Sequence, residues 1–241
     1  MAEGSWSRVH GLIAATVATL LAACATDDRS AIETLKREHA PPGVLVMPLD
    51  VELYEVSAGG IRERRADWTE DAKNHLMDAL HQQAERRRLE LIAFDETGLS
   101  PDVAEQAIAL RSLHRAVGRS ILHYEYGGGP RLPTKPDDTL DWSLGPAVRT
   151  LAEAHNGADY ALFVHLRDSY SSPGRVLFSV AVAVLFRSVA PGGSQTGFAS
   201  LIDLDSGDVV WFNVLGRPGG DVRDAESAAD TASILLRGLP E

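Results

Sequence analysis

The strongest constraint on the fold comes from an apolar stretch near the start of the chain and from the only cysteine, which follows it directly. Residues 11–23 (GLIAATVATLLAA) carry no charge, and Cys24 is the single cysteine among 241 residues. A helix of this length rises about 20 Å, which is short of the roughly 30 Å core of a bilayer. The stretch therefore predicts the apolar part of a signal peptide. Because one cysteine excludes an internal disulfide, the remaining chain must be stabilised by its own core.

Residues 21–24 (LAAC) resemble the lipobox of bacterial lipoproteins. In that box, small side chains fit the cleft of the signal peptidase, and the cysteine thiol receives a diacylglyceryl group. The resemblance implies a signal peptide over residues 1–23, cleavage between Ala23 and Cys24, and lipidation of Cys24. Two or more acyl chains give durable membrane attachment. The alternatives are an ordinary signal peptide and a short buried helix whose cysteine is a small apolar side chain.

Ala25 follows the cysteine. By resemblance to proteobacterial sorting, alanine at this position does not retain a lipoprotein in the inner membrane. The expected location is thus the periplasmic face of the outer membrane, with the lipid as the contact to the membrane. The polar residues after Cys24 predict a flexible tether over 24–42, followed by one domain over 43–241.

The charge balance argues against two classes of partner. The chain has 34 acidic and 23 basic residues, a net charge of −11, and the expected cleavage removes one of each. Nucleic acid requires a basic surface, so it is excluded as a partner. The same overall balance argues against adhesion to anionic lipid through surface charge alone.

Segments with the apolar spacing of a helix alternate with segments typical of strands, and this alternation predicts a mixed α/β fold. Apolar residues at i+4 spacing predict a helix from Asp67, with Glu70 completing a capping-box variant. Ser100 and Pro101 predict the start of another helix, whose apolar side is expected to carry Val103, Ala107, Leu110, Leu113, Val117 and Ile121. The expected helices are 67–88, 100–126, 145–155 and 223–237. The expected strands are 44–49, 51–56 in a hairpin with 61–64, 89–94, 160–166, 197–204 and 209–214.

The end of the chain predicts an antiparallel hairpin and a closing helix. Residues 205–208 (DSGD) supply local hydrogen bonds and an easy positive φ between the last two strands. The glycine- and proline-rich residues 127–138 are expected to form an internal loop. The predicted fold class is α/β, a mixed sheet flanked by helices, with a C-terminal antiparallel hairpin and a closing helix.

Residues 176–186 (VLFSVAVAVLF) contain no charge, but the run is too short to span a bilayer as a helix. A core helix is the first expectation, and a buried strand is the second. The third is a membrane-inserting hairpin or a surface for a partner.

Three segments resemble a group of envelope lipoproteins: residues 157–164 (GADYALFV), 199–212 (ASLIDLDSGDVVWF) and 235–240 (LLRGLP). The group includes the curli secretion lipoprotein family, the neisserial-type lipoprotein antigens and the amino-terminal domain of the Tol-Pal β-propeller protein. The resemblance implies a mixed sheet with helices on its faces, because the hairpin Asp-x-Asp-x-Gly-x-x-x-Trp recurs in these proteins. The apolar run at 176–186 departs from the alternating hairpins of the curli channel and argues against a water-filled pore.

The sequence predicts no catalytic, cofactor or metal site. Residues 192–197 (GGSQTG) miss the G-x-S-x-G pattern by one position and are expected to form a loop. The histidine pairs His75/His81 and His114/His123 lack the spacing of zinc ligands on one helix face. Asp203, Asp205 and Asp208 are expected to serve the turn, with Asp203 pointing away from it. 

Two functional hypotheses follow. The first is a non-enzymatic, lipid-anchored component of envelope assembly or secretion that binds envelope proteins or other copies of itself. The second is a periplasmic enzyme or small-ligand protein whose site is assembled from residues distant in sequence. A pocket with convergent carboxylates or histidines would favour the second, and a smooth surface with one apolar patch would favour the first.

Overall fold

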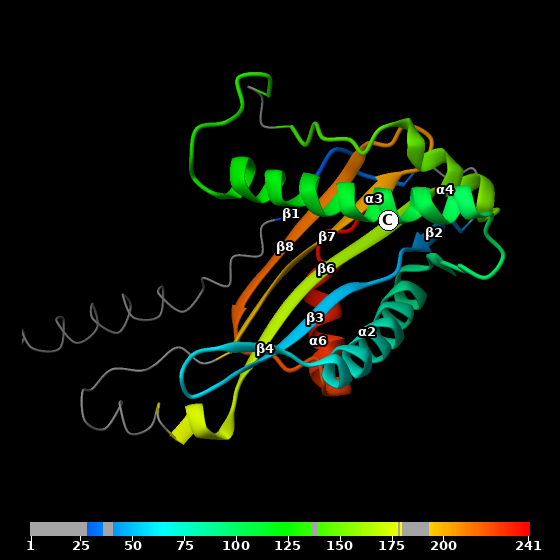
Figure 1. Ribbon diagram of the computed structural model, residues 1–241. Helices are drawn as coiled ribbons and strands as arrows, with labels where there is room; N and C mark the ends of the chain where they lie inside the picture. The colour runs from blue at the N-terminus through cyan, green and yellow to red at the C-terminus, as the bar shows by residue number, and fades with distance from the viewer. Residues whose placement is uncertain (1–27, 36–40, 136–138, 178, 180–192) are drawn as a thin grey trace, which may run out of the picture.

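The computed structural model describes residues 28–35, 41–135, 139–177, 179 and 193–241, and these residues form one sheet with helices on both faces (Figure 1). The strands are β1 (Asp28–Ser30), β2 (Gly43–Val46), β3 (Asp50–Val56), β4 (Arg62–Arg64), β5 (Glu90–Ala93), β6 (Tyr160–Ser171), β7 (Ser194–Asp203) and β8 (Val209–Pro218). The helices are α2 (Ala66–Arg87), α3 (Pro101–Ile121), α4 (Arg149–Ala154) and α6 (Ala225–Leu235), with a π-helical turn at Leu122–Tyr126 and a 3-10 turn at Pro146–Val148.

The sheet is organised around β6. Its strand order is β1-β8-β7-β6-β2-β5, and β3 pairs with β6 beyond the end of β2 and carries β4 on its outer edge. Val44 of β2 pairs with Tyr160 and Asp50 of β3 pairs with His165, both in parallel register. Pro48 lies between these two strands and has no N–H to donate, so one ladder ends and the next begins there. The antiparallel hairpins β3–β4 and β7–β8 and the closing helix α6 confirm the predicted fold class.

Alternate residues of the strands fill two separate cores. Val44 and Leu162 belong to the core under α2 and α6, whereas Leu45 and Phe163 belong to the core under α3 and α4. Successive side chains of a strand point to opposite faces, so a central strand must be apolar on both. The two faces of the sheet are therefore buried by different helices.

The predicted helix at 67–88 is confirmed as α2, but its predicted cap is wrong. Leu76 and Leu80 lie on its buried face. The N-cap residue is Arg65, which makes no capping hydrogen bond through its side chain. Asp67 lies two residues beyond the N-cap position, and its carboxylate instead binds the Arg65 guanidinium at 2.8 Å.

Helix α3 begins at the predicted cap, where the Ser100 hydroxyl accepts a hydrogen bond from the Val103 amide. Its buried stripe includes His114 and Gly118, while Leu113, expected on the buried side, is 42% exposed. Adjacent helix positions are separated by about 100°, so burying His114 turns Leu113 toward solvent.

The expected flexible tether over 24–42 is wrong for part of its length. Residues Asp28–Ser30 form β1, which pairs antiparallel with β8, and Leu35 is only 5% exposed. The edge of a sheet offers unpaired backbone groups, so a polar segment can pair there without a hydrophobic pattern. The signal peptide, Ala23 and Cys24 lie outside the described residues.

The expectation of a buried helix or strand at 176–186 is wrong at the start of the run. Residues 173–177 are helical, but Val176 is 51% exposed and Leu177 is 72% exposed. Ser179 is half-buried, and the other residues of the run lie outside the described part of the chain. The loop expected over 192–197 is also wrong from Ser194 onward, because β7 begins there. No helix in the described ranges is both long enough and apolar enough to cross a membrane.

Gly118→Ala tests how tightly α3 packs on the sheet. A Cβ at Gly118 would lie 2.2 Å from the ring of Phe198, which cannot turn aside because it stacks with His165 and Phe212. We expect the free energy of unfolding in urea to fall by roughly 1–3 kcal/mol from overpacking, although alanine is the better helix former. Gly98→Ala, which meets no atom within 4 Å, is the control and should cause no loss. Equal stability of the two variants would contradict this packing.

Candidate functional site

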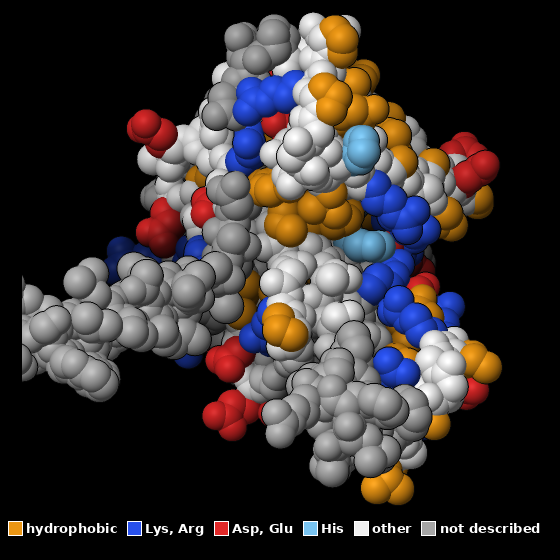
Figure 2. Space-filling model, turned by 90° about the vertical axis from the view of Figure 1, so that its left-hand side faces the viewer, with side chains coloured by type: hydrophobic (Ala, Val, Ile, Leu, Met, Phe, Trp, Pro, Cys, Tyr) orange, Lys and Arg blue, Asp and Glu red, His pale blue; other side chains and the backbone are white. Residues whose placement is uncertain are grey.

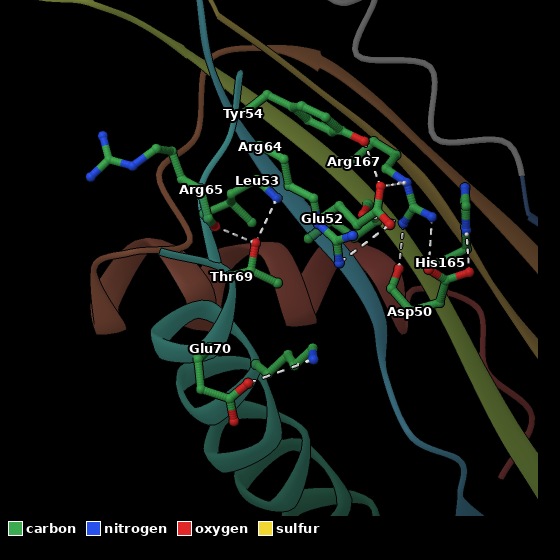
Figure 3. A network of polar contacts seen from close by, with 12 residues as sticks. Asp50, Glu52, Leu53, Tyr54, Arg64, Arg65, Thr69, Glu70, His165 and Arg167 are labelled. Carbon is green, nitrogen blue, oxygen red and sulfur yellow. Dashed lines mark hydrogen bonds and ion pairs between the residues drawn. The ribbon is translucent and has the colours of Figure 1, made fainter. Parts of the chain in front are cut away.

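A charged cluster forms where β3 begins beside β6, on the face of the sheet that α3 covers. The Asp50 carboxylate lies 2.7 Å from the Arg167 guanidinium through Oδ1. Its Oδ2 lies 3.0 Å from Nδ1 of His165 and 2.8 Å from Nε of Arg115. Figure 3 shows Asp50, His165 and Arg167 turned toward one another from neighbouring strands. One carboxylate therefore joins β3, β6 and α3.

Glu52 continues the cluster along β3, because residues two apart in a strand share a face. Its Oε2 accepts a hydrogen bond from the Tyr54 hydroxyl at 2.5 Å and lies 3.3 Å from Nε of Arg167. Arg64 of β4 reaches its other oxygen at 3.6 Å (Figure 3). The cluster thus links β4, β3 and β6.

Both carboxylates of the cluster stay ionised near neutral pH. Burial alone would raise the pKa of Asp50, but hydrogen bonds from His165, Arg167 and Arg115 outweigh it and hold the pKa well below its usual range. Burial would also raise the pKa of Glu52, but the hydrogen bond from the Tyr54 hydroxyl and the charge of Arg167 outweigh it, so this pKa is lowered. Carboxylates held in this way are poor proton acceptors, so the cluster is suited to joining strands rather than to acid–base chemistry.

A serine–histidine pair lies under α3. Nε2 of His114 is 2.6 Å from the Ser200 hydroxyl, and the imidazole stacks on Phe163 with a centroid distance of 4.4 Å. Burial, together with the neighbouring charge of His165, lowers the pKa of His114 to about 3, so the ring is neutral. Ser200 is 1% exposed and no substrate can reach it. The pair resembles a nucleophile and its base in composition, but it is part of the core.

A second polar network lies on the opposite face, between the sheet and α6. Oδ2 of Asp168 accepts hydrogen bonds from the Tyr170 hydroxyl at 2.6 Å and the Gln195 amide at 2.7 Å. Burial raises the pKa of Asp168 despite these bonds. The Gln195 carbonyl in turn accepts from Arg217 and from Thr231 of α6. Because Asp168 is 1% exposed and Gln195 is fully buried, this network fixes α6 on the sheet.

Of the acidic residues in the β7–β8 turn, Asp203 serves the turn, as predicted, but its expected direction is wrong. Its Oδ1 accepts hydrogen bonds from the amides of Asp205 and Ser206, because a carboxylate at this position satisfies the amides of a tight turn. Asp205 pairs with Arg149 at 3.1 Å. An open hollow of about 470 Å³ adjoins these residues. Among the described residues, no group of three or more His, Cys, Asp or Glu could hold a metal ion.

One half of the sheet face on the α3 side is not covered by any described helix. Thr196 of β7 and Gly216 of β8 are exposed there, next to half-buried Val214. Figure 2 views the molecule from the side on which these strand ends lie. Hydrophobic side chains gather in the middle of that view, and a column of Lys and Arg side chains with two His side chains borders them.

The sequence alone does not predict the cluster around Asp50. Asp50 and His165 are 115 residues apart, and neither belongs to a motif with a recognisable spacing. The only signal in the sequence is an unusual polar content at the end of an apolar strand, where Arg167 and Asp168 follow Leu166.

Comparisons with known proteins give matches among solved structures. No family model matches the chain, and no curated protein does. A solved structure of the PelC dodecamer from Paraburkholderia phytofirmans is 13% identical with a TM-score of 0.38, and the match covers 90% of this chain and 99% of that chain. The LpoB C-terminal domain from Salmonella enterica is 13% identical with a TM-score of 0.27, covering 84% and 92%. At scores this low, function must be argued from the geometry of the chain itself.

Asp50→Asn tests the contribution of the cluster to stability. The amide keeps the shape but removes the charge, so we expect the free energy of unfolding at pH 7 to fall by about 2 kcal/mol, the scale of hydrogen bonds to a charged group. Because folding lowers the pKa of Asp50, its contribution is present above the unfolded pKa, about 4, and is lost as the pH falls below it. Urea unfolding between about pH 6 and pH 2 should therefore show a steeper loss for the wild type than for Asp50→Asn.

The control is Asp67→Asn, which removes an exposed carboxylate that pairs with Arg65. Solvent screens this pair, so little stability should be lost at neutral pH. Equal losses of unfolding free energy in the two variants would show that the Asp50 cluster stabilises the fold no more than an exposed ion pair does.

Proposed function

We propose that this chain is a lipoprotein of the outer membrane, held by lipid on Cys24, whose α/β domain binds other proteins and catalyses no reaction. The observation that carries the proposal is the position of the lipobox-like residues 21–24 relative to the sheet. Cys24 is only four residues before Asp28, the first residue of β1. A lipid there would hold the sheet close to the membrane rather than on a long tether.

The chemistry of the polar clusters supports a binding role over a catalytic one. Asp50 and Glu52 are held ionised by cations, and Asp168 is enclosed between the sheet and α6. The Ser200–His114 pair is buried, with a neutral imidazole. Each of these groups is used to join elements of the fold.

The uncovered half of the sheet supports protein as the ligand. This surface, defined by Thr196, Val214 and Gly216, combines exposed strand backbone with mixed polarity and borders the Arg167 cluster. Broad surfaces of this kind suit proteins, because small molecules are bound in concave sites that enclose them. The occupant would be another envelope protein or a second copy of the chain.

Cys24→Ser tests the lipidation. Serine has no thiol to receive the diacylglyceryl group, so the variant should incorporate no radiolabelled palmitate and should appear in the soluble fraction when the full-length protein is expressed in a Gram-negative host. The wild type is the matched control and should be labelled and fractionate with the outer membrane. Label retained in the variant would refute the assignment of Cys24.

Photo-crosslinking tests the binding surface. A photoreactive amino acid at Thr196, on the uncovered half of the sheet, should give discrete adducts in native membranes that are resolved by electrophoresis and identified by mass spectrometry. Gln82, which is also exposed but lies on α2, is the control position and should give no adducts. The same adducts at both positions, or none at Thr196, would contradict a binding role for this surface.

A further inference from the structure

Three of the exposed large hydrophobic side chains in the described ranges lie at one end of the sheet. Ile61, in the turn between β3 and β4, is 66% exposed, and Val176 and Leu177, just after β6, are 51% and 72% exposed. Isolated exposed apolar residues are normal, but a cluster at a protruding end marks a contact surface. In Figure 1, the β3–β4 turn and the helical residues 173–177 lie together at the lower left.

This apolar end, defined as residues 57–61 with 172–177, is built by backbone hydrogen bonds. The Ser172 amide donates to the Val56 carbonyl at 2.9 Å, and the Val176 amide donates to the Ser172 carbonyl at 3.0 Å. A Cβ placed on Gly174 would lie 3.7 Å from Cβ of Ala58, so the two segments touch. The exposed side chains are thus presented by one packed unit.

The direction of β1 shows which end of the sheet Asp28 faces. β1 is antiparallel to β8, with Ser30 opposite Trp211 and Asp28 opposite Asn213. Passing backward from Ser30 to Asp28 therefore leads toward Pro218, the last residue of β8. That end of β8 pairs with the start of β7, which pairs with the end of β6, and the end of β6 pairs with the end of β3. Asp28 is therefore the residue of β1 that lies nearest to the apolar end.

Cys24 lies four residues before Asp28, and four residues span at most about 14 Å, so a lipid on Cys24 is attached within that distance of β1. The six residues of β8 from Asn213 to Pro218 rise about 17 Å toward the apolar end. β1 and β4 lie at opposite edges of the sheet, about five strand spacings or 24 Å apart.

The polar residues at the apolar end suit a lipid surface. β4 presents two arginines, Arg62 and Arg64, with one acid between them, and Gly60 lies beside the Arg175 guanidinium. Arginine next to apolar side chains is typical of segments that lie in a membrane interface, where the cation faces phosphate groups. The opposite end of the sheet carries Asp203, Asp205 and Asp208.

We propose that the apolar end rests on the lipid surface, with Ile61, Val176 and Leu177 inserted among the headgroups while the lipid on Cys24 holds the other edge of the sheet. This inference rests on the proposed lipidation of Cys24. Two contacts near opposite edges fix the orientation of the domain, so that the sheet stands on the membrane and the β7–β8 turn points away from it.

Spin labels test this orientation in the processed, lipidated protein, reconstituted in vesicles of phosphatidylethanolamine and phosphatidylglycerol. The lipid converts the Cys24 thiol to a thioether, so an introduced cysteine is the only free thiol. Labels at Ile61→Cys and Leu177→Cys report on the apolar end. Ile108→Cys is the matched control, because Ile108 is 63% exposed but lies on α3.

Collisions of each label with oxygen, which dissolves in the bilayer, are compared with collisions with a nickel chelate, which stays in water. The ratio of oxygen to nickel accessibility should be several-fold higher at positions 61 and 177 than at position 108. Equal ratios at the three positions, in a protein that stays with the vesicles, would overturn this inference without contradicting the proposed lipidation. A protein without palmitate that remains in the supernatant would overturn the proposed function and this inference with it.

Discussion

β6 pairs with β7 along one edge and with β2 and then β3 along the other, so its twelve residues place most of the sheet. Up to Leu166, its alternate side chains fill the two cores, and beyond that point they become polar. Arg167 then binds Asp50 at 2.7 Å on one face, and Asp168 binds Gln195 at 2.7 Å on the other. A single strand thus contributes both to the two hydrophobic cores and to the two polar clusters.

The change along β6 gives the two ends of the sheet different surfaces. At the end where β6 stops, Ile61 and Leu177 are exposed beside arginines, and at the other end acidic residues form the β7–β8 turn. Between them, the described helices leave part of one sheet face open near Thr196. Under the proposed function, this difference between the two ends lets one end contact lipid while the remaining surface is available to partners. The buried polar clusters hold this arrangement together, since each charged group in them has a partner.

Local patterns explain why much of the fold could be predicted. Leu76 and Leu80 repeat at helical spacing, Ser100 caps α3, and Gly207 adopts the φ of +86° that the β7–β8 turn requires. These signals act over a few residues, so they are visible in the sequence. The β1 strand was missed because an edge strand pairs through its backbone and needs no apolar alternation. Leu113 was placed on the wrong side because the stripe that α3 buries includes a histidine.

The sequence by itself determined the fold class and, through the resemblance at residues 21–24, the expectation of a lipid anchor. Only the tertiary structure decided which polar residues meet. Asp50 is 65 residues from Arg115 and 117 from Arg167, and no local pattern records that the sheet and α3 bring them together. The direction of β1, antiparallel to β8, was also decided there. Strand order and direction follow from contacts between distant segments, whose free energies depend on the whole fold and not on neighbouring residues.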